Sequence, residues 1–242
     1  MQHFMDPKKF YDTVMPKKYG TDYEVARWKN DPLHHAQYWM MERVMKRFVL
    51  PHASSPLRIL EIGPGPGTWT KYLLGVAPEA SFTLVDISET MLAQAKESLS
   101  GNIEFVESDW VSFAPADTYD FFFSSRAFEY VDDKRAALGV VSRALEVGKR
   151  GALITKTPKP LFNWLRGRSS SLHQGQVSPA TLVRLCREVG LRVHATHLAT
   201  ATVPLLRIPW LNKIIFSLFS RMPFVFPFTL LSESYVVAFE KL

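Results

Sequence analysis

The stretch ILEIGPGPGTW, residues 59–69, places glycine at every second position, at Gly63, Gly65 and Gly67. An apolar run leads into these glycines, and an acid, Glu61, stands just before the first of them. Glycine lets a chain turn sharply and lets the backbone approach a ligand where a Cβ atom would collide. A strand that ends in such a loop predicts a site for a nucleotide-like cofactor at the carboxyl end of the strand.

From residue 57 onward, short apolar runs alternate with helical patterns. The expected strands are 57–62, 81–86, 102–107, 119–124, 151–156, 191–199 and 234–240. The expected helices between them are 66–76, 89–99, 133–146 and 179–189. This alternation predicts an α/β fold, a seven-stranded, doubly wound and mostly parallel sheet. No ordinary helix separates the last two strands, so we expect the final strand to be antiparallel and to lie beside its predecessor.

The composition fits one α/β domain with a full core, because 47% of the 242 residues are hydrophobic. The net charge of +6 comes from scattered Lys and Arg residues, which does not favour nucleic acid as a partner. Cys186 is the only cysteine, so the sequence excludes an intrachain disulfide and a cysteine-based metal site. A single cysteine and an N-terminus without a signal-peptide core predict a cytoplasmic protein.

Residues 1–55 are polar and aromatic, and we expect them to form an N-terminal helical cover on a single domain, residues 56–242. Within the cover, residues 31–50 predict a helix that Asp31 caps and Pro32 starts. A late insertion, residues 200–231, is longer than an ordinary connection. Its stretch 203–231 contains four prolines and three basic residues, which argues against a membrane span.

The insertion carries an amphipathic helix pattern. Its apolar side comprises Trp210, Leu211, Ile214, Ile215, Leu218, Phe219 and Met222, and its polar side comprises Asn212, Lys213, Ser217, Ser220 and Arg221. Three interpretations remain open. The helix forms a lid packed on the core, the wall of a pocket for a lipid-like acceptor, or a surface helix in peripheral contact with a membrane through 203–231.

Three classes of cofactor site compete for the glycine loop. A phosphate-binding P-loop requires GxxxxGK[ST], and the sequence contains no such motif. A dinucleotide site prefers GxGxxG, whereas the spacing here is GxGxG with Pro64 and Pro66 between the glycines. The YxxxK pattern of Tyr130 and Lys134 suggests a short-chain dehydrogenase, but so short a pattern arises readily by coincidence.

The third class fits best. EIGPGPG resembles the ExGxGxG signature of class I S-adenosylmethionine-dependent methyltransferases, which have a Rossmann-like fold. Within that class the sequence is similar to the type 11 methyltransferases, and the resemblance covers about residues 57–160. It implies S-adenosylmethionine as the cofactor and no metal. It also implies that Asp86 holds the ribose hydroxyls and Asp109 the adenine amino group, with Trp110 against the ring. The cofactor-binding residues that it implies are Glu61, Gly63, Pro64, Gly65, Gly67, Thr68, Asp86, Ile87, Asp109, Trp110, Ser124, Ser125 and Arg126.

Methyl transfer requires an acceptor lone pair about 3 Å from the methyl group, and a base only where the acceptor carries a proton. The family tends to hold its acceptor over strands four and five, which makes Glu129, Tyr130 and His173 the candidate catalytic residues. Tyr130 stands where the family often has histidine, so the sequence leaves the identity of the base open. Tyr19 and Tyr23, in the aromatic N-terminal segment, are candidate acceptor-binding residues.

The sequence therefore predicts methyl transfer to an oxygen atom of a small or amphiphilic molecule, such as a lipid-linked or sugar-linked acceptor. A nucleic-acid or protein methyltransferase is one alternative, although the sequence lacks a clustered basic groove and an NPPY-like motif after strand four. A Rossmann oxidoreductase that binds NAD is the other. The oligomeric state is not predicted.

Overall fold

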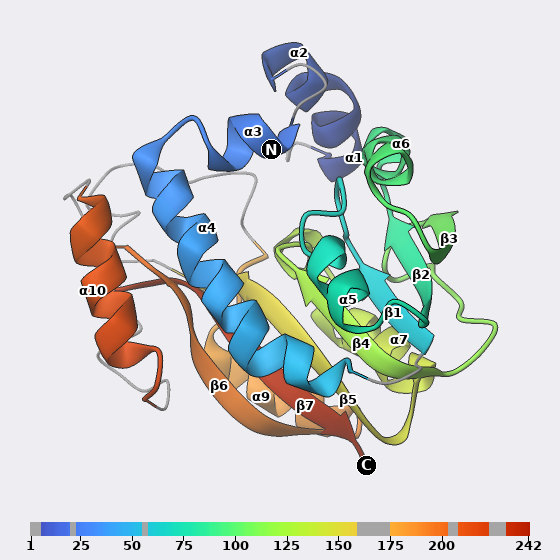
Figure 1. The fold of residues 1–242 in the computed structure, drawn as a ribbon. Helices are drawn as coiled ribbons and strands as arrows, with labels where there is room; N and C mark the ends of the chain where they lie inside the picture. Colours follow the sequence, from blue (N-terminus) through green and yellow to red (C-terminus); the bar gives the residue numbers. More distant parts are fainter. Residues whose placement is uncertain (1–5, 20–22, 55–57, 159–174, 203–207, 223–230) are drawn as a thin grey trace, which may run out of the picture.

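The structure is a computed structural model that describes residues 6–19, 23–54, 58–158, 175–202, 208–222 and 231–242. Its centre is a seven-stranded sheet with the strand order β3-β2-β1-β4-β5-β7-β6 (Figure 1). The strands are β1 (Arg58–Ile62), β2 (Ser81–Asp86), β3 (Asn102–Glu107), β4 (Tyr119–Ser125), β5 (Leu145–Lys156), β6 (Leu191–Ala201) and β7 (Ser232–Lys241). The first five are parallel, and β7 runs antiparallel to both β5 and β6. The predicted doubly wound sheet with an antiparallel last strand is confirmed.

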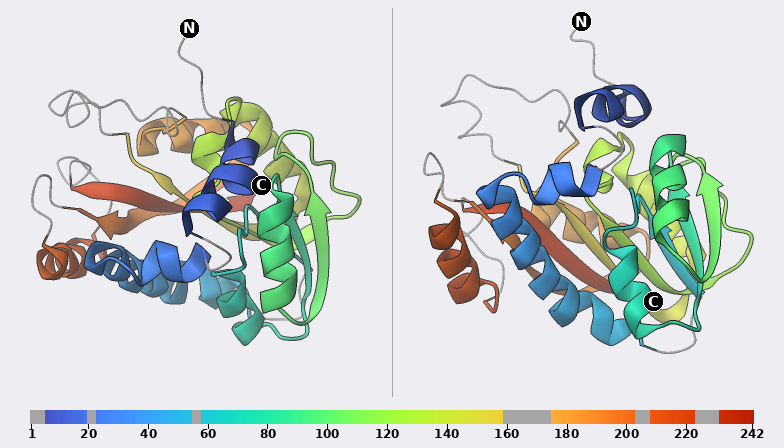
Figure 2. Two further views of the ribbon diagram at one scale, coloured as in Figure 1. Left: turned by 90° about the horizontal axis from the view of Figure 1, so that it is seen from above. Right: turned by 45° about the horizontal axis from the view of Figure 1, so that its top comes forward.

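Helices cover both faces of the sheet (Figure 2). The helices are α1 (Pro7–Lys9), α2 (Met15–Tyr19), α3 (Tyr23–Trp28), α4 (Pro32–Val44), α5 (Thr70–Val76), α6 (Glu89–Ser98), α7 (Lys134–Ala144), α9 (Pro179–Glu188) and α10 (Pro209–Phe219), with the short helical turns η1 (Phe10–Val14), η2 (Met45–Val49), η3 (Leu50–His52) and η4 (Phe128–Tyr130). One hydrophobic core, which includes Met40 and Phe121, lies under α4 and α5. A second core, which includes Phe122 and Cys186, lies under α7 and α9 on the opposite face.

Side chains that the sequence marks as helix caps occupy those positions. The Asp31 carboxylate accepts a hydrogen bond from the Leu33 N–H at 2.7 Å, and α4 begins at the following proline. Ser88 caps α6 by accepting from the Met91 N–H at 3.1 Å. Each bond satisfies an N–H group that the first helical turn leaves without a partner.

Two of the wrongly predicted helix boundaries have a clear structural cause. Helix α5 begins at Thr70 rather than at residue 66, because Gly67 has a φ of +86°, which an α-helix does not accommodate. Helix α7 ends at Ala144 rather than at residue 146, because Leu145 already pairs with Tyr119 as the first residue of β5. The first change matters for the site, since it lengthens the loop between β1 and α5.

The late insertion contains α10, which packs against α4 and β6 (Figure 1). Phe216 is buried there, with its ring centroid 6.0 Å from that of Trp39 on α4. The predicted division into an apolar and a polar side is wrong in part, because Asn212 and Ser220 share the buried seam with Phe216. Trp210, assigned to the apolar side, is 63% exposed. Within the described ranges, no helix combines the length and hydropathy needed to cross a bilayer.

Candidate active site

A cavity of about 630 Å³ lies at the carboxyl ends of the parallel strands, below the N-terminal helices. Its volume falls in the usual range for a small-molecule or cofactor site. The predicted site residues that line it are Gly63, Pro64, Gly65, Thr68, Asp86, Ile87, Asp109, Trp110, Ser125, Arg126, Tyr130 and Tyr23. The structure thus brings together residues from the amino-terminal cover and from the ends of β1, β2, β3 and β4.

The glycine loop brings its backbone up to this cavity at Gly63 and Gly65. Gly63 and Gly65 have φ values of +74° and +56°, a region that favours glycine. The Gly63 N–H donates to the Val85 carbonyl at 2.7 Å, which ties the start of the loop to β2. A Cβ atom at Gly65 would meet nothing within 4 Å, so this part of the loop faces open space.

Asp86, at the end of the neighbouring strand β2, accepts a hydrogen bond from the glycine loop. Its Oδ2 accepts from the Gly65 N–H at 3.1 Å, and its Oδ1 accepts from the Ser88 N–H at 3.0 Å. Burial raises the pKa of the Asp86 carboxyl to about 6, although the N–H groups of Ser88 and Gly65 oppose the shift. The carboxylate therefore lines the cavity ionised at neutral pH, with the glycine loop held against it.

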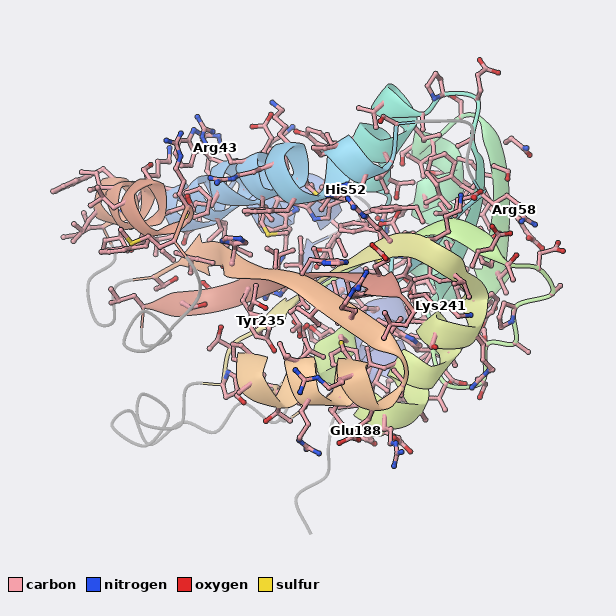
Figure 3. The ribbon with its side chains drawn as sticks, turned by 90° about the horizontal axis from the view of Figure 1, so that it is seen from below. Arg43, His52, Arg58, Glu188, Tyr235 and Lys241 are labelled. Carbon is pink, nitrogen blue, oxygen red and sulfur yellow. The ribbon has the colours of Figure 1, made fainter. Side chains whose placement is uncertain are left out.

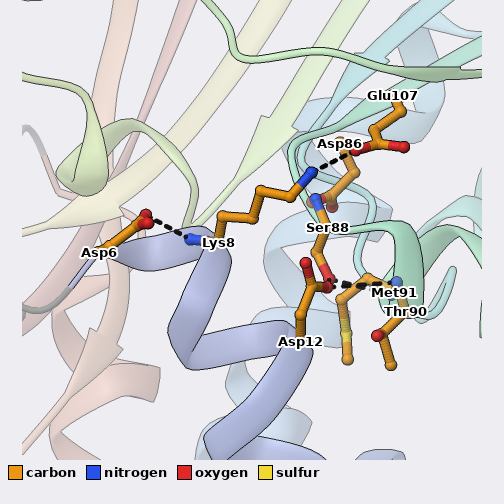
Figure 4. A network of polar contacts seen from close by, with 8 residues as sticks. All are labelled: Asp6, Lys8, Asp12, Asp86, Ser88, Thr90, Met91 and Glu107. Atoms are coloured by element: carbon orange, nitrogen blue, oxygen red, sulfur yellow. Dashed lines mark hydrogen bonds and ion pairs between the residues drawn. The ribbon is translucent and has the colours of Figure 1, made fainter.

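The N-terminal cover is fastened beside Asp86 by a polar network (Figure 4). The Asp12 carboxylate accepts from the Ser88 hydroxyl and from the Thr90 N–H. Lys8 forms an ion pair with Glu107 at the end of β3. These contacts hold α1 and η1 over the ends of β2 and β3, so the cover forms part of the cavity wall.

Three buried side-chain oxygens have no hydrogen-bond partner among the described residues: Glu61 Oε1, Ser124 Oγ and Ser125 Oγ. All three come from the carboxyl ends of β1 and β4, next to the glycine loop. The other Glu61 oxygen accepts from the Thr70 hydroxyl at 2.8 Å. Burial raises the pKa of the Glu61 carboxyl to about 8. Buried polar atoms are normally paired, so this group of oxygens indicates a place where a polar ligand completes the site.

The Glu61 pKa leads to a stability prediction for the ligand-stripped protein. An unfolded glutamate ionises near its usual pKa of 4.5, whereas native Glu61 keeps its proton up to about pH 8. Native protein therefore binds more protons than unfolded protein between these values, and Glu61 makes stability fall as pH rises through this window. We expect Glu61→Gln to raise the Tm relative to wild type by several degrees at pH 8 and by less at pH 5, as measured by thermal unfolding.

The exposed Glu97 on α6 provides the control, because Glu97→Gln changes the same functional group outside the site. We expect that variant to track the wild-type Tm at both pH values. A Glu61→Gln effect equal at pH 5 and pH 8 would show that Glu61 is ionised in the native protein throughout this range.

Asp109 and Trp110 line the cavity at the end of β3, but the side chain of each also forms hydrogen bonds to the protein backbone. Asp109 Oδ1 accepts from the N–H groups of Val111 and Ser112, both at 3.0 Å. Hydrogen bonds from the side chain and backbone of Ser112 hold the pKa of Asp109 below its ordinary value. The Trp110 indole N–H donates to the Ala137 carbonyl at 3.0 Å, and only 4% of the residue is exposed. The Asp109 carboxylate is thus fixed in orientation, and the indole shows the cavity only a small part of its ring.

Arg126 and Glu129 form a buried ion pair at the end of β4. Arg126 Nε donates to Glu129 Oε1 at 3.0 Å, and Glu129 Oε2 accepts from the Thr155 hydroxyl at 3.2 Å. Arg126 has a φ of +65°, and no other non-glycine residue in the described part has a positive φ. Glu129 is 1% exposed and does not line the cavity. The structure therefore does not bring this predicted catalytic residue to the cavity; its carboxylate holds Arg126 in place instead.

Tyr130 reaches the cavity in a group of three tyrosines. Its hydroxyl lies 3.1 Å from that of Tyr11, and the ring of Tyr11 meets those of Tyr130 and Tyr23 edge to face. Burial raises the pKa of Tyr130 to about 12. At neutral pH the phenol is protonated, so the Tyr130 hydroxyl can donate a hydrogen bond.

The remaining predicted residues lie elsewhere. Gly67 and Ser124 stand behind the cavity wall with Glu61. Tyr19 ends α2, but its side chain lies outside the described part of the chain, and so does all of His173. The cavity also has lining residues that no sequence motif indicated: Pro7, Phe10, Tyr11, Met15, Arg27, Trp28, Trp69 and Lys156. Of these residues, only Lys156 could have been predicted from the sequence, because it stands at the end of an apolar strand.

Part of the chain is similar in sequence to known methyltransferases. The family described as a methyltransferase domain matches residues 59–148. Malonyl-[acyl-carrier protein] O-methyltransferase 1 of Ilyobacter polytropus is 34% identical over 116 residues, which are 47% of this chain and 43% of that protein. Trans-aconitate 2-methyltransferase of Rhodopseudomonas palustris strain BisB18 is 36% identical over 106 residues, which are 44% of this chain and 40% of that protein. The matched regions span less than half the length of these curated relatives.

The fold comparison extends over nearly the whole chain. The structure of magnesium protoporphyrin IX methyltransferase from Synechocystis PCC 6803, solved with bound S-adenosylhomocysteine, superposes with a TM-score of 0.67 and covers 97% of both chains at 12% identity. That likeness shows the fold, and the sequence match identifies residues 59–148 as similar to the methyltransferase domain. The chain therefore contains a methyltransferase domain at residues 59–148 and has the fold of the class I S-adenosylmethionine-dependent methyltransferases.

Proposed function

We propose that the protein transfers the methyl group of S-adenosylmethionine to an oxygen atom of a small or amphiphilic acceptor. The order of groups across the sheet carries this proposal. The carboxylates of Asp86 and Asp109 lie at the ends of β2 and β3, and the glycine loop follows β1 in the middle. Tyr130 follows β4 on the other side. One cavity thus provides a cofactor half and, next to it, an acceptor half. The O-methyltransferase activity in the name of the Ilyobacter relative supports oxygen as the acceptor atom.

The polar groups of the cavity fit this cofactor. The Asp86 carboxylate accepts hydrogen bonds, as the ribose hydroxyls require. The unpartnered Glu61 Oε1 lies below the glycine loop, where a cationic ammonium group would stabilise its ionised form. Ser125 lines the cavity, and its buried hydroxyl, which has no partner among the described residues, can bind the amino-acid end of the cofactor.

The chain's own contribution to the reaction is alignment and the exclusion of water. When bound, the cofactor supplies a methyl group on a sulfonium leaving group. The aromatic residues Phe10, Tyr11 and Trp28 from the N-terminal cover line the cavity above the strand ends. An aromatic wall of this kind helps to keep water from the methyl group. The Tyr130 hydroxyl can donate a hydrogen bond that orients the acceptor oxygen.

The proposed activity is tested by incubating the protein with S-adenosylmethionine labelled at the methyl group and a panel of oxygen acceptors. The panel comprises small acids, alcohols, phenols and lipid-linked sugars, with amines as the contrasting class. We expect label in an O-methyl product and a reduced rate for Tyr130→Phe, which keeps the ring but removes the donor. Label that enters only amines would contradict oxygen as the acceptor atom.

We also propose that the segment 203–231 makes peripheral contact with an anionic membrane. Of this segment the structure describes 208–222 and residue 231. Its helix α10 exposes a stripe of large apolar side chains at a spacing of four residues: Trp210, Ile214, Leu218 and Met222, with exposures of 63%, 48%, 59% and 48%. Figure 3 shows Arg43 of α4 beside α10, and the Arg43 guanidinium lies 3.4 Å from the centroid of the Trp39 ring. An exposed apolar stripe beside basic residues suits an interfacial helix. No described α10 residue lines the cavity, so a pocket wall for the acceptor has no support from this helix.

Vesicle binding tests the membrane contact. We expect the protein to sediment with phosphatidylglycerol vesicles and much less with phosphatidylcholine vesicles. The double variant Trp210→Ser and Leu218→Ser should lose at least tenfold in vesicle affinity. Val147 is 71% exposed on β5, away from α10, so Val147→Ser is the matched control and should bind as wild type. Equal binding by all three proteins would contradict the contact.

A further inference from the structure

The acceptor half of the cavity is rich in positive charge. Arg27 on α3, Arg126 after β4 and Lys156 at the end of β5 all line the cavity. They come from three separate parts of the chain and meet at one end of the site. In the strand order, β5 lies beyond β4, on the side away from β2 and β3. The cations therefore gather at the end of the cavity opposite the two acids assigned to the adenosine.

The side-chain amine of Lys156 has no hydrogen-bond or ion-pair partner among the described residues. Burial lowers the pKa of its amine to about 7, and the nearby Arg126 and Arg27 guanidinium groups add to the shift. Glu129 and Glu233 are the acids that oppose it. Both acids are engaged elsewhere, Glu129 with Arg126 and Glu233 with the Thr202 hydroxyl at 2.8 Å. A lysine held among cations in this way lacks a counter-ion of its own.

Arg27 is similarly placed. Its guanidinium lies 5.0 Å from the centroid of the Trp28 ring, and no carboxylate of the described residues lies within salt-bridge distance. Stacking on an aromatic face orients the planar guanidinium while its donors stay available. Arg126 differs, because its Nε is already occupied by Glu129. Two basic side chains, Lys156 and Arg27, thus line the cavity without a carboxylate in salt-bridge contact among the described residues.

We propose that Lys156 and Arg27 form an anion subsite that binds a carboxylate group of the methyl acceptor. The inference rests on the proposed function and names its substrate class, a carboxylic acid. Lysine and arginine both donate charge-assisted hydrogen bonds to a carboxylate, and arginine does so in a bidentate geometry. The cofactor also carries a carboxylate, but the glycine loop supplies N–H groups for it at the end of β1, two strands away from Lys156.

Calorimetry on the whole protein separates the two carboxylates. The first titration measures the Kd of S-adenosylhomocysteine. The second titrates malonate into the saturated complex, with malonamide as its neutral counterpart. The titrations compare four proteins: wild type, Lys156→Met, Lys156→Arg and Lys96→Met. Lys96→Met is the surface control, because Lys96 is exposed on α6. The malonate titration is repeated at pH 8 in phosphate and in Tris, whose different ionisation enthalpies report proton uptake.

We expect malonate to bind wild type and malonamide not to bind. Lys156→Met should weaken malonate binding at least tenfold and leave the Kd of S-adenosylhomocysteine within twofold. Lys156→Arg should restore most of the affinity, and Lys96→Met should match wild type. Because the pKa of Lys156 is about 7, its amine is mostly neutral at pH 8 and should take up a proton when malonate binds. Lys156→Met should abolish that uptake.

Three results would overturn the inference. One is a failure of malonate to bind the wild-type complex. Another is a tenfold loss of S-adenosylhomocysteine affinity in Lys156→Met with malonate binding unchanged, which would assign the cations to the cofactor's own carboxylate. The third is a wild-type protein that does not bind S-adenosylhomocysteine at all, which would overturn the proposed function itself and the inference with it.

Discussion

Replacing Asp86 with Ala is expected to weaken the binding of S-adenosylhomocysteine by at least about 100-fold. Two hydrogen bonds to a charged carboxylate contribute roughly 1.5–3 kcal/mol each, and about 2.7 kcal/mol corresponds to that factor. The substitution also removes the acceptors for the Gly65 and Ser88 N–H groups, which hold the glycine loop against β2. Isothermal titration calorimetry measures the loss, and an unchanged Kd would refute the ribose assignment of Asp86.

The pH dependence of the same affinity provides an independent check. The carboxylate is the acceptor of the ribose hydroxyls, and its pKa of about 6 means that it becomes protonated as the pH falls below 6. Wild-type affinity should therefore fall by about tenfold for each pH unit well below 6, whereas the affinity of Asp86→Ala should not follow this curve. Glu104→Gln, which changes an exposed acid on β3, should behave as wild type.

Replacing Gly63 with Ala is expected to destabilise the fold by about 2–5 kcal/mol. Its φ of +74° strains any residue with a Cβ, which costs roughly 1–2 kcal/mol. The new Cβ would lie 2.2 Å from the Cβ of Ala127, a backbone-anchored atom that cannot move aside, and overpacking adds about 1–3 kcal/mol. Urea unfolding, with the two-state fit checked by a second probe, measures the loss.

Gly65→Ala is the matched control two residues along the same loop. Its φ of +56° carries a similar strain, but the added Cβ meets no protein atom within 4 Å. We expect it to cost only about 1–2 kcal/mol of stability. Because Gly65 lines the cavity, the added methyl group should still reduce S-adenosylhomocysteine affinity at least tenfold. Equal destabilisation by the two substitutions would mean that Gly63 does not approach Ala127 as the structure shows.

Much of the fold follows from local patterns. The strands and their antiparallel ending are predictable because buried parallel strands form continuous apolar runs bounded by turn residues. The errors arise where tertiary geometry decides. Helix α5 begins later than predicted because of the backbone conformation of Gly67. Helix α7 ends before Leu145 because Leu145 pairs with Tyr119 across the sheet. The buried side of α10 was predicted wrongly because α10 has apolar residues on several sides. Contacts with neighbouring elements, here with Trp39 on α4, determine which side is buried.

The candidate site was predictable in its cofactor half and less so in its acceptor half. Asp86 and Asp109 follow strand ends in the sequence, so topology alone brings them to one edge of the sheet. Arg27 and Tyr11 come from the N-terminal cover, and no sequence spacing reports which of its side chains point into the cavity. Glu129 stands at the expected position, yet its side chain is buried in the ion pair with Arg126 and does not line the cavity.

The most direct test of the central claim is a calorimetric titration of the purified, ligand-stripped protein with S-adenosylmethionine, S-adenosylhomocysteine and NAD. We predict micromolar binding of the first two compounds at one site per chain and no binding of NAD. Binding of NAD without binding of either S-adenosyl compound would contradict the assignment of the glycine loop and of every cofactor contact built on it.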